Sequence, residues 1–150
     1  MGKLSTALKL TQSIRTKTFE LGGHTFKVVV PLNKELEDVT QRIINVPKEE
    51  VAARLEKMTK SLTEVKLDNV EVTDDDVIVD GISTKETVVS ILQMERKITE
   101  YFKFLVPEAG NWDDLTYADI DEDFPLQVQF EVLEKITEAI QPGYKDARKN

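Results

Sequence analysis

Three alternating aspartates, Asp119, Asp121 and Asp123, have the spacing of the first ligands in a calcium-binding loop. Such a loop also needs a glycine at its sixth position and a bidentate glutamate at its twelfth. Those positions hold Phe124 and Phe130. The pattern therefore starts a calcium loop without completing one, and a solvated acidic loop is the simpler interpretation.

A second acidic stretch, residues 74–80, fails the same test. Counted from Asp76, a glycine stands at the sixth position, but Ile78 and Thr87 occupy positions that must supply ligands. Neither acidic cluster predicts a metal site.

Nucleophilic and zinc chemistry lack the residues that they need. The chain has no cysteine and one histidine, His24, which excludes disulfides, thiolate ligands and a histidine pair for zinc. A serine–histidine–aspartate triad would have to use His24, which follows Gly22 and Gly23 with no nucleophile elbow nearby. The two glycines lack the Gly-Lys-Ser/Thr of a phosphate loop. We therefore expect no catalytic residue, cofactor or metal, and a protein that is not an enzyme.

Aromatic residues are more informative about function. Tyr101, Phe102, Phe104 and Trp112 fall close together in the sequence. Aromatic side chains are enriched at the centres of protein interfaces, and exposed apolar patches mark binding sites. We predict that these four residues bind a partner, for example a helix in a groove. The alternative is that they belong to an ordinary core.

Composition describes a folded, acidic chain. Its 150 residues are 40% hydrophobic and 32% charged, with a net charge of −8, which predicts one domain over 1–150 with its own core. No apolar run approaches the roughly eighteen residues of a membrane span, and the first residues do not form a signal-peptide pattern. The negative charge argues against a nucleic-acid binder. We expect a cytosolic protein with neither nucleic-acid nor membrane partners.

Charge is distributed unevenly along the chain. Residues 1–66 carry 12 basic and 8 acidic side chains, residues 67–141 carry 5 and 19, and residues 142–150 carry 3 and 1. The net charges are therefore +4, −14 and +2. This asymmetry suggests head-to-tail self-association into a homo-oligomer or a basic partner for the middle. The simpler interpretation is an acidic, solvated face.

The elements that would position these residues begin with a β-hairpin. Apolar and polar residues alternate on both sides of Gly22-Gly23, which predicts a hairpin over about 17–30. Residues 1–16 favour a mobile N-terminal helix, and residues 142–150 a basic C-terminal tail. Stretch 67–82 favours short extended segments, with a helical turn capped by Thr73 as the alternative. Residues 107–125 are predicted to form an acidic loop.

Helical periodicity predicts further helices over about 33–43, 47–64, 83–105 and 126–141. Ser83 and Glu86 have the spacing of a capping box at the start of the longest one. Its apolar arc exceeds the stripe of about 100° that one packed face needs, so it is either buried on several sides or partly faces a partner. The predicted fold is α+β and predominantly α-helical, with an N-terminal β-hairpin packed on a cluster of four or five helices.

Three stretches resemble one protein family. They are residues 18–32 (TFELGGHTFKVVVPL), residues 101–108 (YFKFLVPE), and residues 115–120 and 124–131 (LTYADI and FPLQVQFE) with the ending YKDARKN at 144–150. In these stretches and in length, the chain is similar to the tail assembly chaperones of long-tailed bacteriophages. None of the stretches is a chemical motif.

The resemblance implies a protein that is absent from the mature virion and acts in the host cell cytoplasm. It would bind and solubilise the tape measure protein and help to recruit the tail tube protein. The resemblance also implies a frameshifted, longer form of the chain, and Arg148-Lys149-Asn150 could be encoded by a slippery heptamer. A structural protein of the tail or neck, present in the virion, is the alternative.

Overall fold

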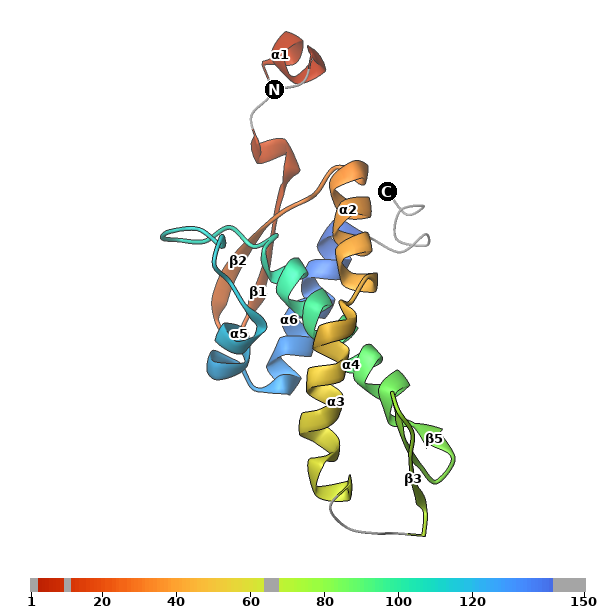
Figure 1. Ribbon diagram of the computed structural model, residues 1–150. Coiled ribbons are helices and arrows are strands. Elements are labelled where there is room, and N and C mark those ends of the chain that lie inside the picture. The colour runs from red at the N-terminus through yellow and green to blue at the C-terminus, as the bar shows by residue number, and fades with distance from the viewer. Residues whose placement is uncertain (1–2, 10–11, 64–67, 142–150) are drawn as a thin grey trace. The chain divides into compact units, whose positions relative to one another are not determined.

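In the computed structural model, residues 3–9, 12–63 and 68–141 are described. The elements in chain order (Figure 1) are α1 (Lys3–Leu8), η1 (Gln12–Arg15), β1 (Thr16–Leu21), β2 (His24–Val29), α2 (Asn33–Ile44), α3 (Lys48–Thr63), β3 (Val70–Val72), β4 (Val77–Val79), β5 (Ile82–Ser83), α4 (Thr84–Phe102), α5 (Tyr117–Asp123) and α6 (Leu126–Ile140). The prediction of a mainly helical α+β chain with an N-terminal hairpin is confirmed. The predicted tail at 142–150, with its slippery-site residues, lies outside the described residues.

The chain forms two compact units. Unit 1 comprises residues 1–39 and 98–150, and unit 2 comprises residues 40–97, so the divisions fall inside α2 and α4. Along the described ranges, no helix combines the length and the apolar character needed to cross a membrane. The single domain predicted for 1–150 stays a prediction.

The β1–β2 hairpin of unit 1 forms where the alternation predicts it. The strands pair antiparallel with Phe19 opposite Phe26, and these two rings stack with centroids 5.0 Å apart. Gly22 and Gly23 make the turn with φ of +60° and +80°, a region that side-chain-bearing residues rarely adopt. The hairpin packs against α6.

The longest helix, α4, ends three residues earlier than the predicted boundary near 105, because the chain turns to pair with β2. The Val29 N–H donates to the Phe104 carbonyl at 2.8 Å, and the Val106 N–H donates to the Lys27 carbonyl at 2.8 Å. Pro107 favours this ending, since a residue before proline avoids helical backbone angles. Residues 104–106 thus lie beside β2 as a short third segment of the hairpin sheet.

The prediction of a loop over 107–125 is wrong in part, since α5 occupies residues 117–123. A capping box starts it: the Thr116 hydroxyl accepts from the Asp119 N–H at 3.3 Å, and the Asp119 carboxylate accepts from the Thr116 N–H at 3.0 Å. The alternating aspartates therefore stand on a helix, and Asp119 serves its first turn.

Unit 1 is organised around α6 and the end of α4. Its buried side chains come from β2, α2, α4, α5 and α6, and include Val28, Val39, Ile98, Tyr101, Phe102, Ile120, Gln129, Val132 and Ile136. Gln129 is the polar member of this set, and all its side-chain hydrogen bonds stay within unit 1.

Unit 2 has a core between α3 and α4. Val51, Leu55, Val88 and Leu92 form it, with Val46 and Val89 packed against it. Arg54 and Glu95 join the two helices by a bidentate ion pair at 2.8 and 2.9 Å. The apolar residues of α4 are therefore divided between two cores, which accounts for the wide arc seen in the sequence.

The ambiguous stretch 67–82 is extended, and the alternative of a helical turn after Thr73 is wrong. Strands β3 and β4 pair antiparallel with Val72 opposite Val77, and β5 adds a third short strand beside β4.

The Ser83 hydroxyl accepts from the Glu86 N–H at 3.1 Å at the start of α4. This bond is the serine half of the predicted capping box.

Candidate functional site

The four aromatics predicted to bind a partner all lie in unit 1, but in different environments. Tyr101 and Phe102 are only 6% and 5% exposed and belong to the core. Phe104 is half-buried beside Tyr101, with ring centroids 5.6 Å apart. Trp112 is half-buried, and its indole Nε1 donates a hydrogen bond to the Leu105 carbonyl at 2.6 Å. Tyr101 and Phe102 thus support the fold, and partner binding by this group stays a prediction.

Two of these residues meet again in a cavity of unit 1 of about 280 Å³, which we call the aromatic pocket. Phe102 and Trp112 line it together with Phe26 and Phe124. The rings of Phe102 and Phe124 meet edge to face, with centroids 5.9 Å apart. The chain thus brings four aromatic rings from four separate segments to one cavity, while Tyr101 and Phe104 do not line it.

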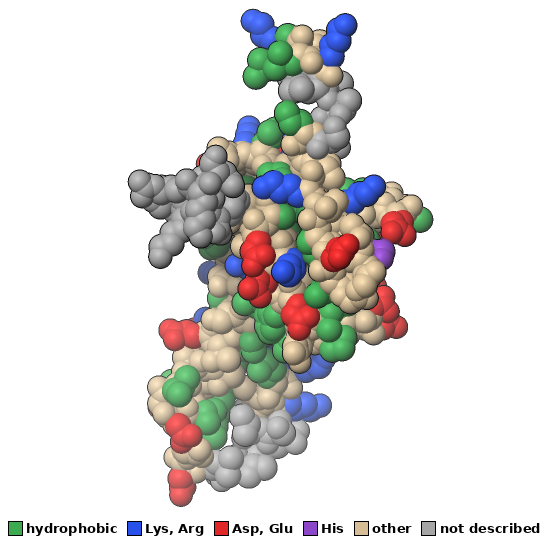
Figure 2. All heavy atoms as spheres, turned by 180° about the vertical axis from the view of Figure 1, so that it is seen from behind, with side chains coloured by type: hydrophobic (Ala, Val, Ile, Leu, Met, Phe, Trp, Pro, Cys, Tyr) green, Lys and Arg blue, Asp and Glu red, His purple; other side chains and the backbone are tan. Residues whose placement is uncertain are grey.

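Exposed polar side chains surround the aromatic pocket. Glu108, Asp119 and Asp123 are exposed and contribute to its lining, as does His24. The His24 ring meets Phe26 edge to face at 4.6 Å, and its Nε2 lies 3.7 Å from a Glu108 carboxylate oxygen. Figure 2 shows the histidine at the surface with acidic side chains near it. Among the described residues that line this pocket, none is a lysine or arginine.

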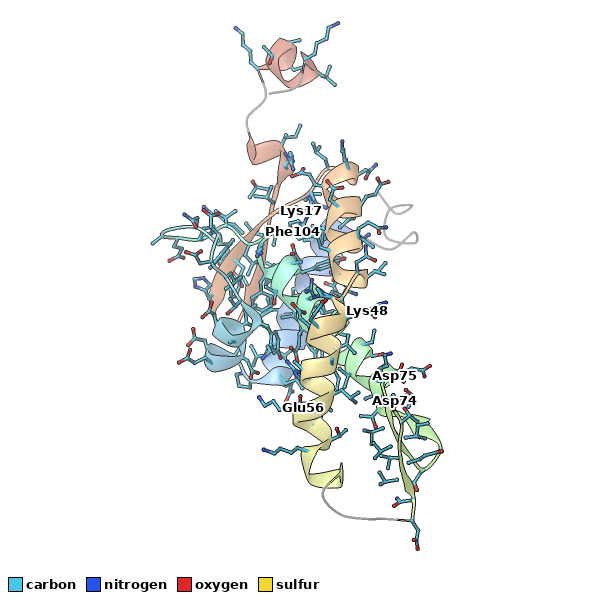
Figure 3. All side chains as sticks on the ribbon, viewed as in Figure 1. Lys17, Lys48, Glu56, Asp74, Asp75 and Phe104 are labelled. Carbon is cyan, nitrogen blue, oxygen red and sulfur yellow. The ribbon has the colours of Figure 1, made fainter. Side chains whose placement is uncertain are left out.

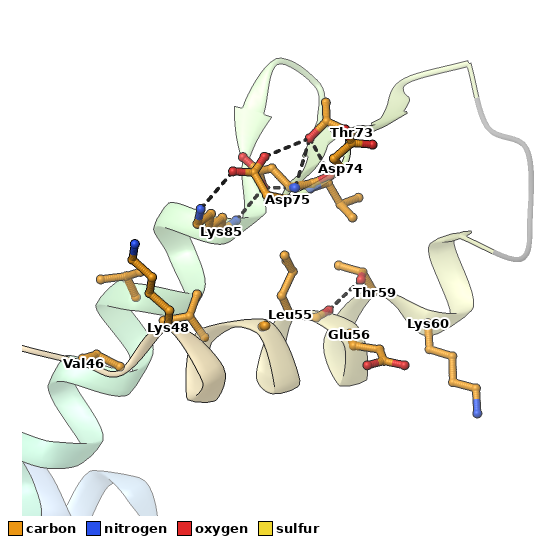
Figure 4. A pocket seen from close by; sticks show the side chains of 15 residues that line it. Val46, Lys48, Leu55, Glu56, Thr59, Lys60, Thr73, Asp74, Asp75 and Lys85 are labelled. Carbon is orange, nitrogen blue, oxygen red and sulfur yellow. Dashed lines mark hydrogen bonds and ion pairs between the residues drawn. The ribbon is translucent and has the colours of Figure 1, made fainter.

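A larger cavity lies in unit 2, between α3, the β3–β4 turn and the start of α4. Its volume is about 800 Å³, and we call it the α3 groove. Val51 and Leu55 on α3, Val77 on β4 and Val89 on α4 give it an apolar floor. In Figure 4, Leu55 points across the groove toward the turn.

The rims of the α3 groove differ in charge. Lys48 and Lys60 stand on the α3 side, with Glu56 between them in the sequence, and Asp74 and Asp75 stand on the turn (Figure 3, Figure 4). All five side chains belong to exposed residues. The groove therefore has an apolar centre between a mainly basic rim and a mainly acidic rim, where Lys85 pairs with Asp75 at 3.2 Å.

Asp76 holds the acidic rim in shape. Its carboxylate accepts hydrogen bonds from the Val77 and Lys85 backbone N–H groups at 2.7 and 2.8 Å and from the Ser83 hydroxyl at 2.5 Å. Burial raises the pKa of Asp76, but these hydrogen bonds and the charge of Lys85 outweigh it, so the pKa lies below the ordinary value. The Asp76 carboxylate therefore has a structural role in the turn. This role accounts for an aspartate at this position without a bound metal.

Within the described part of the chain, no group of three or more histidine, aspartate or glutamate side chains is arranged to hold a metal ion. Sequence reasoning did not identify the α3 groove. The predicted helix over 47–64 includes Val51 and Leu55, and stretch 67–82 was predicted to form short extended segments, but nothing in the sequence indicates that these two segments face each other. The charged residues that flank Val51 and Leu55 in the sequence were the available indication of a binding surface on this helix.

Comparison of this chain with protein-family models, with curated proteins and with solved structures finds no match. The roles of the two cavities are therefore inferred from their own chemistry.

Proposed function

We propose that this chain is a non-enzymatic assembly chaperone for the tail of a long-tailed bacteriophage. It binds and solubilises the tape measure protein and helps to recruit tail tube subunits, together with a longer, frameshifted form of itself. It acts in the host cytoplasm and leaves before the virion is mature. The resemblance of residues 18–32, 101–108, 115–120, 124–131 and 144–150 to that family motivates the proposal.

The observation that carries the proposal is the α3 groove. A long helical protein carries apolar side chains at i, i+3, i+4 and i+7, and such a stripe associates unless another surface covers it. The groove offers an apolar floor of valine and leucine, and its volume of about 800 Å³ lies within the range of about 300–1,000 Å³ typical of ligand pockets. One helical segment seated there would have its apolar stripe removed from water.

The rims supply what an apolar floor alone lacks. Lys48 on one side and Asp74 on the other can pair with opposite charges that flank an apolar stripe on the client. Exposed pairs of this kind contribute little affinity, about 0–1 kcal/mol each, but they fix the register. We infer that the floor supplies affinity and the rims supply orientation.

Co-expression with the tape measure protein tests this function. Two neighbouring alanines of α3 provide a matched pair of variants: both are exposed, but Ala52 lines the groove and Ala53 does not. Ala52→Glu places a charge over the apolar floor, whereas Ala53→Glu adds the same charge beside it. We expect soluble tape measure protein with the wild type and with Ala53→Glu, and its loss to the pellet with Ala52→Glu.

Each outcome decides something different. If the wild-type chain fails to keep the tape measure protein soluble, the chaperone function is wrong. If Ala52→Glu works as well as Ala53→Glu, the groove is not the binding site. Fractionation of finished particles separates the remaining alternative, because a structural protein of the tail or neck would be found in the virion.

A further inference from the structure

We propose that the aromatic pocket of unit 1 binds an arginine side chain of a partner protein. This site is separate from the α3 groove, since every residue that lines the pocket lies in unit 1 and every residue that lines the groove lies in unit 2. The pocket is therefore testable whether or not the chain acts on a tape measure protein.

The size of the pocket indicates a single side chain as its occupant. Its volume is about 280 Å³, against about 800 Å³ for the groove. At about 30 Å³ per water molecule, that is room for roughly nine waters. A long side chain fits this space, while a helix with several side chains does not.

The interior favours a cation with an apolar stem. Phe26, Phe102, Trp112 and Phe124 line the space, and the faces of aromatic rings attract a guanidinium or ammonium group within about 6 Å. Leu105 and Leu115 add aliphatic surface that methylene groups can cover. A purely apolar side chain would contact the aliphatic surface of Leu105 and Leu115 but would gain no electrostatic attraction from the aromatic rings.

Charges at the opening select the same class of ligand. Glu108 and Asp123 are exposed carboxylates, and Asp119, the third, already accepts the Thr116 N–H in the α5 cap. No lysine or arginine among the described lining residues neutralises them. An anionic ligand would be repelled. A cation entering the pocket meets the carboxylates of Glu108 and Asp123, which take no part in the α5 cap.

Arginine suits this pocket better than lysine does. Its planar guanidinium stacks on aromatic faces, is weakly hydrated and pairs with carboxylates in a fixed fork. The lysine ammonium is a compact, strongly hydrated point charge that loses more hydration on entering an aromatic cavity. The Trp112 indole is held by its hydrogen bond to Leu105, so one wall is fixed before a ligand arrives.

Trp112 also provides the readout, because it is the sole tryptophan of the chain. The full chain, labelled with ¹⁵N, is titrated with the capped tripeptide Gly-Arg-Gly while the Trp112 indole N–H signal and the intrinsic fluorescence are followed. Matched probes are the same tripeptide with citrulline, which keeps the shape of arginine but has no charge, and those with lysine and leucine. We expect a saturable shift with arginine and about fivefold weaker binding with citrulline.

Two carboxylate variants complete the design. Glu108→Gln removes a charge at the opening and should weaken arginine binding about threefold, whereas Asp114→Asn removes an exposed charge from the same loop at a residue that does not line the pocket and should leave binding unchanged. The Glu108 side chain is 84% exposed, so the variant is expected to fold. Equal binding of arginine and citrulline, of arginine and lysine, or of the Glu108→Gln variant and wild type would overturn the proposal. Preference for leucine, or no saturable shift with arginine, would do so as well.

Discussion

The fully buried amide of Gln129 provides the sharpest test of how unit 1 is held together. Its side chain is 0% exposed. Its Oε1 accepts from the Tyr117 hydroxyl at 2.8 Å, and its Nε2 donates to the Phe124 carbonyl at 2.8 Å and to an Asp121 carboxylate oxygen at 3.1 Å. One side chain on α6 thus fixes three residues of the α5 region. We expect Gln129→Met, which keeps the length and removes the amide, to destabilise the protein.

The size of the effect follows from these partners. Each hydrogen bond contributes about 1 kcal/mol net, and a buried partner left without one costs more. Asp121 is exposed and regains water, whereas Tyr117 and Phe124 are half-buried and regain it incompletely. The larger apolar surface of methionine offsets a part. The expected loss is about 2–3 kcal/mol, which lowers the melting temperature by about 4–12 °C at this chain length.

Thermal and urea unfolding followed by circular dichroism measure this loss. Gln127→Met is the matched control, because Gln127 lies on the same helix but is exposed, and it should stay within about 0.5 kcal/mol of wild type. Tyr117→Phe combined with Gln129→Met should cost less than the sum of the two, since both remove one shared bond. Equal stabilities of the two methionine variants would refute the network's role. One cooperative transition would also support the single predicted domain.

Three further changes test separate parts of the fold. Gly23→Ala should lower the free energy of unfolding by about 1 kcal/mol, because alanine is strained at a φ of +80° although there is open space around the new methyl group. An unchanged melting temperature would contradict this backbone requirement for glycine. Because the pKa of Asp76 is lowered in the folded chain, its contribution to stability is present above about pH 4 and is lost as the pH falls through the folded-state pKa; Asp76→Asn should lack that loss in acid unfolding curves, and Asp74→Asn should retain it. Burial raises the pKa of Tyr101, so wild type should lose stability above about pH 10 relative to Tyr101→Phe, and parallel alkaline unfolding curves would argue against it.

The sequence was informative where a local pattern decides the structure. Alternation around two glycines predicted the β1–β2 hairpin, and apolar periodicity predicted the start of α6. It was less informative where distant segments compete for the same residues. The end of α4 is set by β2, whose backbone groups bind residues 104–106. No local signal reports that partner.

The candidate sites show the same limit. Phe102 and Trp112 were predicted as functional from their type, and both line the aromatic pocket, but Phe26 and Phe124 reach it from other segments. Tyr101 and Phe102 proved to be core, which composition alone could not separate from an interface. The three alternating aspartates had a metal-like spacing, and the structure uses Asp119 for a helix cap and Asp121 for a buried amide.

The pairing of β2 with residues 104–106 has a consequence for synthesis of the chain on the ribosome. The hairpin can form as soon as Val29 has emerged. The second edge of β2, however, is fully paired only when Val106 has emerged, 77 positions later (106 − 29). At about 5–20 residues per second, this edge of β2 stays unpaired for roughly 4–15 s while its other edge pairs with β1. During this time its free N–H and C=O groups can pair with any other nascent strand. The nascent chain therefore passes through an aggregation-prone interval that the finished fold conceals.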